Sequence, residues 1–219
     1  MPTEQIVGRV RRALLLDATA FEEVRDDAAW MPICLGLAAA ALLLGGLGSF
    51  FWGLVALDNR PSGFFVDNFI LGDVFLILLW LAGIAVTYVV LTQIYREQVA
   101  PDALVRVVTL GHIPFALSFF VWIPGIGFGF GLLAIAAMFF YTIFGLRAAY
   151  PALDPFRTMV SVLAGFAIWA MILPLLSSSG DAFSPGTFIF EWTEDVTKDV
   201  GNFDINLSDF KIDFGTPSQ

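Results

Sequence analysis

Long apolar runs are the feature that most limits what this chain can fold into. Residues 33–57 carry no charged side chain, and similar runs follow at 69–95, 107–123, 126–146 and 159–176. Of these, only 69–95 contains an acidic residue, Asp73. A helix needs about 20 mainly apolar residues to cross the hydrocarbon core of a bilayer. Only 14% of the residues are charged and the mean hydropathy is +0.81, whereas about 25% are charged in soluble domains. The sequence therefore predicts an all-α integral membrane bundle of five transmembrane helices over residues 33–176.

The third apolar run differs from the others. It is short and contains Gly111, His112 and Pro114. We expect its helix to start near Pro101, because proline suits the first helical turn.

The segment before the first span, residues 1–32, carries charges of both signs. It places Ile6, Val10, Ala13 and Leu14 on one face of a helix beside Arg9, Arg11 and Arg12, which predicts an amphipathic helix. Two roles are open: an interfacial helix whose arginines meet anionic membrane lipids, or a cytoplasmic cap packed on the bundle. Thr19 and Glu22 fit a capping box that starts a second helix at Thr19.

The arginines lie mainly on one side of the predicted spans. All of them except Arg60 fall before span one, between spans two and three, or between spans four and five. Positively charged loops favour the cytoplasmic side, so we predict a cytoplasmic N-terminus and, with five spans, a C-terminus outside. The predicted location is a bacterial cytoplasmic (inner) membrane.

Residues 177–219 form an acidic, aromatic-rich tail on the exported side. Its apolar side chains alternate with polar or smaller ones, a pattern that predicts extended, β-prone segments. A lone hairpin is marginal in water, so one interpretation is that the tail docks on a membrane-protein partner by strand addition or in a groove. The other is a disordered acidic tail. The candidate partner-binding residues are Phe188, Phe190, Trp192, Phe203, Ile205, Phe210, Ile212 and Phe214.

Alternating glycines mark the stretch "VWIPGIGFGFG", residues 121–131. It lacks the Gly-Lys-Ser/Thr ending of a phosphate-binding loop and the third glycine of a dinucleotide motif, which would be at Phe130. Pro124 and Gly125 instead suit a tight turn between spans three and four. The pairs Gly125/Gly129 and Gly127/Gly131 have the spacing at which small residues let helices pack closely.

Several segments resemble the Yip1-domain family in its bacterial and archaeal form. They are "RVRRALLLDATAFEEVRDD", "LVRVVTLGHIPFALSFFVWIPGIGFGFGLL" and "FGLRAAYPALDPFRTMVSVLAGF", within residues 8–176. The resemblance implies a five-span bundle with a cytoplasmic N-terminus. Its more specific pieces are Asp17, Phe21 and Glu22, the pair Gly111 and Pro114, the turn 123–125, and the exit 145–147.

Ionisable side chains are rare inside the predicted spans, and such residues are functional candidates because their burial is costly. Asp73 has a functional interpretation and a bland one, a wetted residue near the outer interface. His112, the only histidine, is either a hydrogen-bonded core residue in a kinked helix or a proton-sensitive group.

The residue types also limit the functions that we consider. With no pair of catalytic side chains and no cluster of metal ligands, we predict no enzyme activity, cofactor or metal. The net charge of −9 argues against nucleic acid. The leading hypothesis is a membrane scaffold or assembly protein, such as an accessory subunit that docks through its tail. The alternative is a small-molecule or lipid carrier, with polar candidates at Asp73, Thr87, Tyr88, Thr92 and His112.

Overall fold

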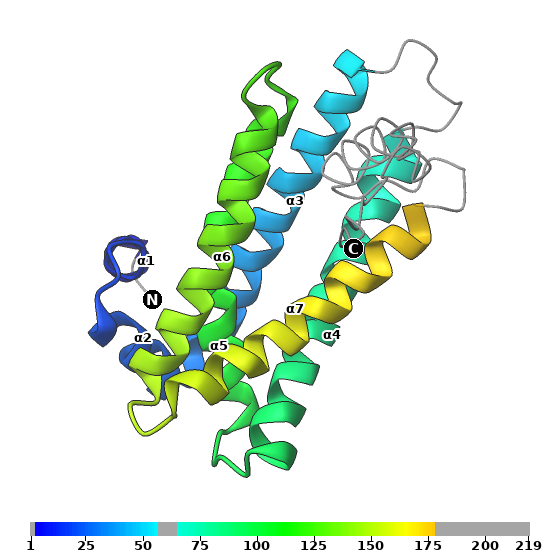
Figure 1. The fold of residues 1–219 in the computed structure, drawn as a ribbon. Coiled ribbons are helices and arrows are strands. Elements are labelled where there is room, and N and C mark those ends of the chain that lie inside the picture. Colours follow the sequence, from blue (N-terminus) through cyan, green and yellow to red (C-terminus); the bar gives the residue numbers. More distant parts are fainter. Residues whose placement is uncertain (1–2, 57–64, 178–219) are drawn as a thin grey trace, which may run out of the picture.

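The structure, a computed structural model, describes residues 3–56 and 65–177 (Figure 1). This part of the chain consists of helices joined by short connections and contains no strand. The tail residues proposed for partner binding lie outside it. The helices are α1 (Thr3–Leu14), α2 (Ala18–Asp26), the 3₁₀ turn η1 (Ala28–Trp30), α3 (Met31–Ala56), the π-helical η2 (Phe65–Leu71), α4 (Gly72–Val89), the π-helical η3 (Val90–Ile94), α5 (Pro101–Gly111), the 3₁₀ helix η4 (Ile113–Trp122), α6 (Gly127–Ala149) and α7 (Pro155–Ser177).

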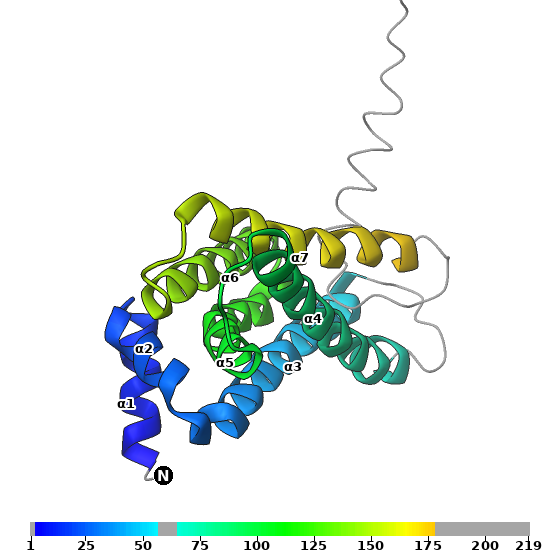
Figure 2. The ribbon, with the colours of Figure 1, turned by 90° about the horizontal axis from the view of Figure 1, so that it is seen from below.

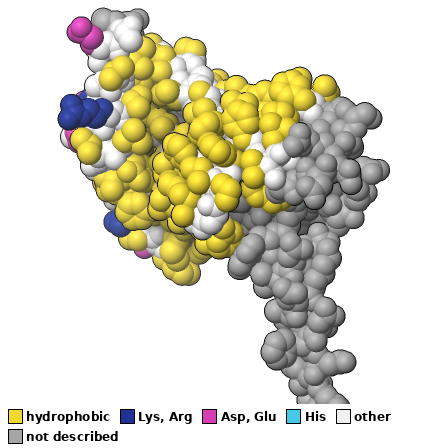
Figure 3. Space-filling view, turned by 90° about the horizontal axis from the view of Figure 1, so that it is seen from above, with side chains coloured by type: hydrophobic (Ala, Val, Ile, Leu, Met, Phe, Trp, Pro, Cys, Tyr) yellow, Lys and Arg dark blue, Asp and Glu magenta, His cyan; other side chains and the backbone are white. Residues whose placement is uncertain are grey.

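Four helical stretches of the described chain are long and apolar enough to cross a membrane. They are Ala28–Val55, Phe69–Ile94, Pro101–Trp122 and Gly127–Ala149, which confirms the membrane-helix character predicted for the first four spans. The third begins at Pro101, as expected. α7 starts earlier than the predicted run 159–176, and its role as a fifth span stays a prediction. From the end opposite α2, hydrophobic side chains cover most of the described surface, and the charged ones in view lie along one edge (Figure 3).

The third span lies at the centre of the bundle. Seen from below, α5 is surrounded by α2, α3, α4 and α6 (Figure 2). The buried share is 61% for this span, against 44%, 39% and 33% for the first, second and fourth. Glycines make this position possible: a Cβ at Gly48 of α3 would lie 2.6 Å from the Phe119 carbonyl oxygen, and one at Gly111 would lie 2.8 Å from the Thr142 Cα of α6.

The N-terminal helices are joined by an aspartate cap. Asp17 accepts hydrogen bonds from the Thr19 backbone N–H (3.0 Å) and from its hydroxyl (2.7 Å), and these bonds hold the pKa of Asp17 below its ordinary value. The predicted capping box at Thr19 is wrong, because α2 begins at Ala18 with Asp17 as its N-cap. Aspartate caps a helix as well as threonine does, and here it stands one position before the helix.

α2 is held on the surface of the bundle by hydrogen bonds and by an apolar contact. The guanidinium of Arg106, which is buried in α5, donates to the backbone oxygens of Val24 (2.9 Å) and Arg25 (2.5 Å). These carbonyls are in the last turn of α2, where carbonyl groups lack helical partners. On the apolar side, Phe21 packs against Gly145 of α6, where a Cβ would lie 2.6 Å from the ring. α2 is therefore packed on the bundle through both its last turn and its apolar face.

Candidate functional site

The central span is broken at His112. Pro114 has no backbone N–H and cannot continue an α-helix through this point, and the chain changes to 3₁₀ bonding. The His112 N–H donates to the Thr109 carbonyl (3.1 Å), and the Phe115 N–H donates to the His112 carbonyl (2.9 Å). The following 3₁₀ helix runs from Ile113 to Trp122, which is unusual because such helices rarely exceed 3–4 residues.

A cavity of about 60 Å³ lies beside this break, between the central span and the helices around it. Its wall contains no acidic or basic side chain other than His112. The lining residues are Leu42 of α3; Leu79, Trp80, Gly83, Ile84 and Thr87 of α4; Val108, His112 and Phe115 of the central span; Met138, Phe139 and Thr142 of α6; and Val162, Gly165 and Phe166 of α7.

His112 offers a hydrogen-bond acceptor at the cavity. Its Nδ1 lies 2.8 Å from the Val108 carbonyl oxygen. A carbonyl oxygen only accepts, so Nδ1 carries the hydrogen, and Nε2 of the neutral ring is an acceptor. Among the described residues, Nε2 has no partner.

Trp80 also lines the cavity. Its indole ring lies 5.6 Å from the His112 ring, edge to face. Trp80 is 6% exposed, and its Nε1–H has no acceptor in the part of the chain that the structure describes. Buried tryptophan N–H groups usually have a partner, so this group is an unmatched donor inside the bundle.

Two threonine hydroxyls complete the polar lining. Thr87 Oγ1 donates to the Gly83 carbonyl (2.9 Å), and Thr142 Oγ1 donates to the Met138 carbonyl (2.8 Å). Each hydroxyl donates its hydrogen to a carbonyl of its own helix, and the lone pairs on its oxygen can still accept a hydrogen bond. The residues that line the cavity therefore include one unmatched donor, Trp80 Nε1, and several acceptors, without a fixed charge.

Asp73 lies apart from this cavity. It is 2% exposed, and neither carboxylate oxygen has a hydrogen-bond partner among residues 3–56 and 65–177. It faces Gly46 of α3, where a Cβ would overlap the carboxylate. The interpretation of Asp73 as a wetted interfacial residue does not hold in this structure, because α3 covers the carboxylate.

Of the other polar candidates, one threonine lines the cavity and one lies outside it. Thr87 lines the cavity, whereas the half-buried Thr92 donates to the Tyr88 carbonyl (2.8 Å) and is not part of the lining. Trp80 and Thr142 were not among the predicted site residues. One signal for Trp80 was available, since tryptophan favours the ends of membrane spans and this one is in the middle of α4.

The predicted turn and packing residues have different surroundings. Pro114 is buried in the central span. Pro124 and Gly125 are exposed between η4 and α6, and Gly125 has the left-handed φ of +82° that glycine adopts without strain. Gly127 packs so closely on its hairpin partner that a Cβ would overlap the Val121 carbonyl. Gly131 is buried, and Gly129 is exposed with nothing within 4 Å of a Cβ.

No group of three or more histidine, cysteine, aspartate or glutamate side chains that could hold a metal ion occurs among the described residues. Comparisons of the chain with protein-family models, with curated proteins and with solved structures gave no match. The Yip1-like resemblance therefore stays a prediction.

Proposed function

We propose that this chain is an intramembrane carrier that binds a small, uncharged polar molecule in the cavity beside His112. The observation that carries the proposal is a cavity at the break of the central span whose lining includes both His112 and Trp80, two residues that keep, within the described chain, an unpartnered acceptor, Nε2, and an unpartnered donor, Nε1. A bound molecule with both a donor and an acceptor group matches this pair. Its binding offsets the cost of leaving these groups unmatched in an apolar environment.

The size of the cavity limits the ligand. On the same scale, a cavity of about 10–15 Å³ holds one water molecule, so 60 Å³ admits solutes of only a few heavy atoms. The absence of acidic or basic side chains from the lining, apart from His112, disfavours an ion. Urea and glycerol are suitable probes of this ligand class.

The break in the central span supports a carrier in particular. Membrane carriers commonly bind their substrates at discontinuous helices near the middle of the bilayer, because the interrupted backbone allows one part to move against another. Here α5 and η4 meet at His112, which is also the residue that borders the cavity. A carrier corresponds to the alternative hypothesis from the sequence.

The experiment is solute uptake by proteoliposomes that contain the full chain. Stopped-flow light scattering after an inward gradient of urea or glycerol is expected to show faster uptake than in protein-free vesicles. His112→Phe, which removes the acceptor, is expected to reduce the excess uptake at least several-fold. Thr92→Val is the control, because Thr92, like His112, bonds to the backbone carbonyl four residues earlier but lies outside the cavity lining. Uptake equal to that of empty vesicles for both solutes would count against transport.

The assembly function stays a prediction, because its proposed docking residues lie in the tail outside the described chain. Affinity purification from the native membrane tests it. A stoichiometric partner that is lost when the chain ends at Ser179 would support docking through the tail, and identical recovery of both chains without partners would exclude it.

A further inference from the structure

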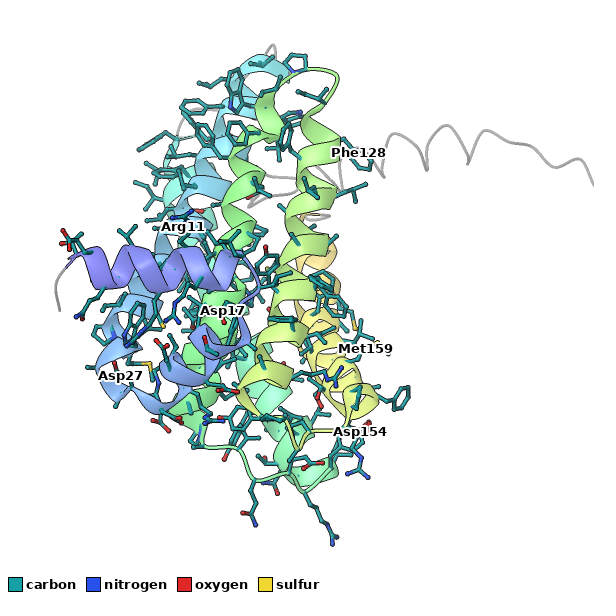
Figure 4. All side chains as sticks on the ribbon, turned by 90° about the vertical axis from the view of Figure 1, so that its left-hand side faces the viewer. Arg11, Asp17, Asp27, Phe128, Asp154 and Met159 are labelled. Atoms are coloured by element: carbon teal, nitrogen blue, oxygen red, sulfur yellow. The ribbon has the colours of Figure 1, made fainter. Side chains whose placement is uncertain are left out.

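α1 lies across the bundle, whereas the spans run along it (Figure 4). Its last residue, Leu14, is fixed to α6 by a hydrogen bond from Tyr141 Oη to the Leu14 carbonyl oxygen (2.6 Å). This bond sets the level at which α1 meets the transmembrane part of the chain.

At that level, the exposed side chains of α6 change from apolar to charged. Phe140, beside Tyr141, is 54% exposed, as expected for a side chain in contact with lipid. Arg147 is also exposed and lies six residues further along the helix, a rise of about 9 Å. Tyrosine itself is enriched where membrane spans enter the headgroup region. α1 therefore lies at the edge of the apolar zone.

α1 has three faces of different character. Ile6, Val10 and Ala13 pack on the apolar core. Arg9 and Arg12 turn to α2, where both reach Glu23 (2.7 and 2.6 Å). The third face contains the exposed residues Val7 (60%), Arg11 and Leu14 (39%), with the exposed Glu4 at its first turn; the helical repeat brings these positions together.

The arginines of α1 also differ in their electrostatic partners. The hydrogen bond from Arg12 and the charge of Arg9 hold the pKa of Glu23 below its ordinary value. Arg11 points away from α2 (Figure 4), and among the described residues no carboxylate pairs with it. Arg11 is thus the arginine of α1 that has no acidic partner in the described part of the chain, and it lies on the exposed face of the helix.

We propose that the Val7–Arg11–Leu14 face is a lipid-binding surface. Val7 and Leu14 enter the boundary between headgroups and acyl chains, and the Arg11 guanidinium binds the phosphate of an anionic phospholipid. The proposal is independent of the carrier function, because α1 contributes no residue to the cavity.

Electron paramagnetic resonance accessibility tests the lipid contact. Nitroxide labels are placed at Val7→Cys, Leu14→Cys and Gln5→Cys in the full-length Cys34→Ala protein, reconstituted with phosphatidylglycerol and phosphatidylcholine. Gln5 is the control, because it is exposed and shares the helix face of Arg9 and Arg12. Labels at 7 and 14 are expected to collide more with oxygen than with a water-soluble nickel chelate, and the label at 5 the reverse. Equal behaviour of all three, or shielding of 7 and 14 from both reagents, would overturn the proposal.

The retention of lipid in native mass spectrometry tests the role of Arg11. One arginine near a membrane surface contributes about 1 kcal/mol, equivalent to about a fivefold preference. Arg11→Gln is expected to lower the ratio of bound phosphatidylglycerol to phosphatidylcholine by about that factor, and Arg11→Lys to keep it. An unchanged ratio for Arg11→Gln, or equal losses for both variants, would contradict phosphate binding at this residue.

Discussion

The carboxylate of Asp73 occupies the space that a side chain at position 46 would fill. Gly46→Leu is therefore expected to force α3 and α4 apart, since overpacking a filled contact costs about 1–3 kcal/mol. Thermal unfolding in detergent measures the effect as a lower Tm. Gly36→Leu on the same helix is the control, because no atom lies within 4 Å of a Cβ there.

A double variant shows whether this loss comes from the contact itself. Asp73→Ala makes room at Gly46, so Gly46→Leu/Asp73→Ala is expected to recover part of the Tm. A double variant that is as unstable as the sum of the two single changes would show that position 46 and Asp73 do not interact.

The sequence predicts which single residues are unusual but not what surrounds them. Asp73 and His112 are conspicuous because ionisable side chains are rare in apolar spans. The burial of Asp73 depends on Gly46, and the acceptor at His112 depends on the Val108 carbonyl and on Trp80. The Val108 bond is local, but Gly46 and Trp80 lie on helices distant in sequence from Asp73 and His112, so no local pattern contains these two contacts.

At the scale of elements, Gly127 and Gly129 have the same predicted packing role, but the hairpin of η4 and α6 gives them different surroundings. A Cβ at Gly127 would overlap the Val121 carbonyl, whereas one at Gly129 would contact nothing. We expect Gly127→Ala to lower the Tm. Gly129→Ala is expected to be neutral or slightly stabilising, because alanine favours a helix by about 1 kcal/mol over glycine. Equal effects in thermal unfolding would contradict the hairpin geometry.

The attachment of α1 to α2 is expected to depend on pH. The pKa of Glu23 is lowered in the folded chain, so its ion pairs stabilise the contact above the ordinary glutamate pKa and lose this contribution as the pH falls through the lowered value. In detergent, the spin-label distance between Gly8→Cys and Arg147→Cys is expected to broaden below about pH 4.

The glutamine variant of Glu23 is the control for this titration. Glu23→Gln lacks the charge, so its distance distribution is expected to be broad already at pH 7 and to change less on acidification. A distribution in the wild-type background that stays narrow from pH 7 to acid would contradict a role for these ion pairs.

The helices themselves were largely predictable, because long apolar runs and breakers such as Pro114 and Pro124 act locally. The error at the start of α2 concerns two neighbouring residues that can both act as the N-cap. Thr19 and Asp17 are both good caps, and the choice between them depends on where α1 ends and how α2 docks through Phe21 and Arg106.

At the scale of the whole molecule, α1 and the turn at residues 123–126 lie at different levels along the bundle (Figure 1). The arginine distribution predicts that the N-terminus is cytoplasmic. In intact cells, a membrane-impermeant maleimide is therefore expected to label Gly125→Cys, and Gly8→Cys only after permeabilisation, in a Cys34→Ala background. Labelling of both from outside would contradict the predicted orientation.

The arrangement of the spans was not predictable from the sequence. The spans are apolar on nearly all faces, so periodicity does not reveal which one is central. The third takes this place because Gly48 and Gly111 allow close backbone contact on two sides. The cavity follows from that arrangement, since it is lined by five helical segments that only the assembled bundle brings together.

The central claim is that the cavity beside His112 binds a small polar molecule, and the single histidine makes a direct measurement possible. Nitrogen-15 NMR of the histidine-labelled protein in lipid reports the state of both ring nitrogens. We predict a protonated Nδ1 and an unprotonated Nε2 whose shift changes saturably with urea or glycerol, and a weaker response in Trp80→Phe. A protonated Nε2 in the neutral ring, or a shift that does not respond to either solute, would contradict the account.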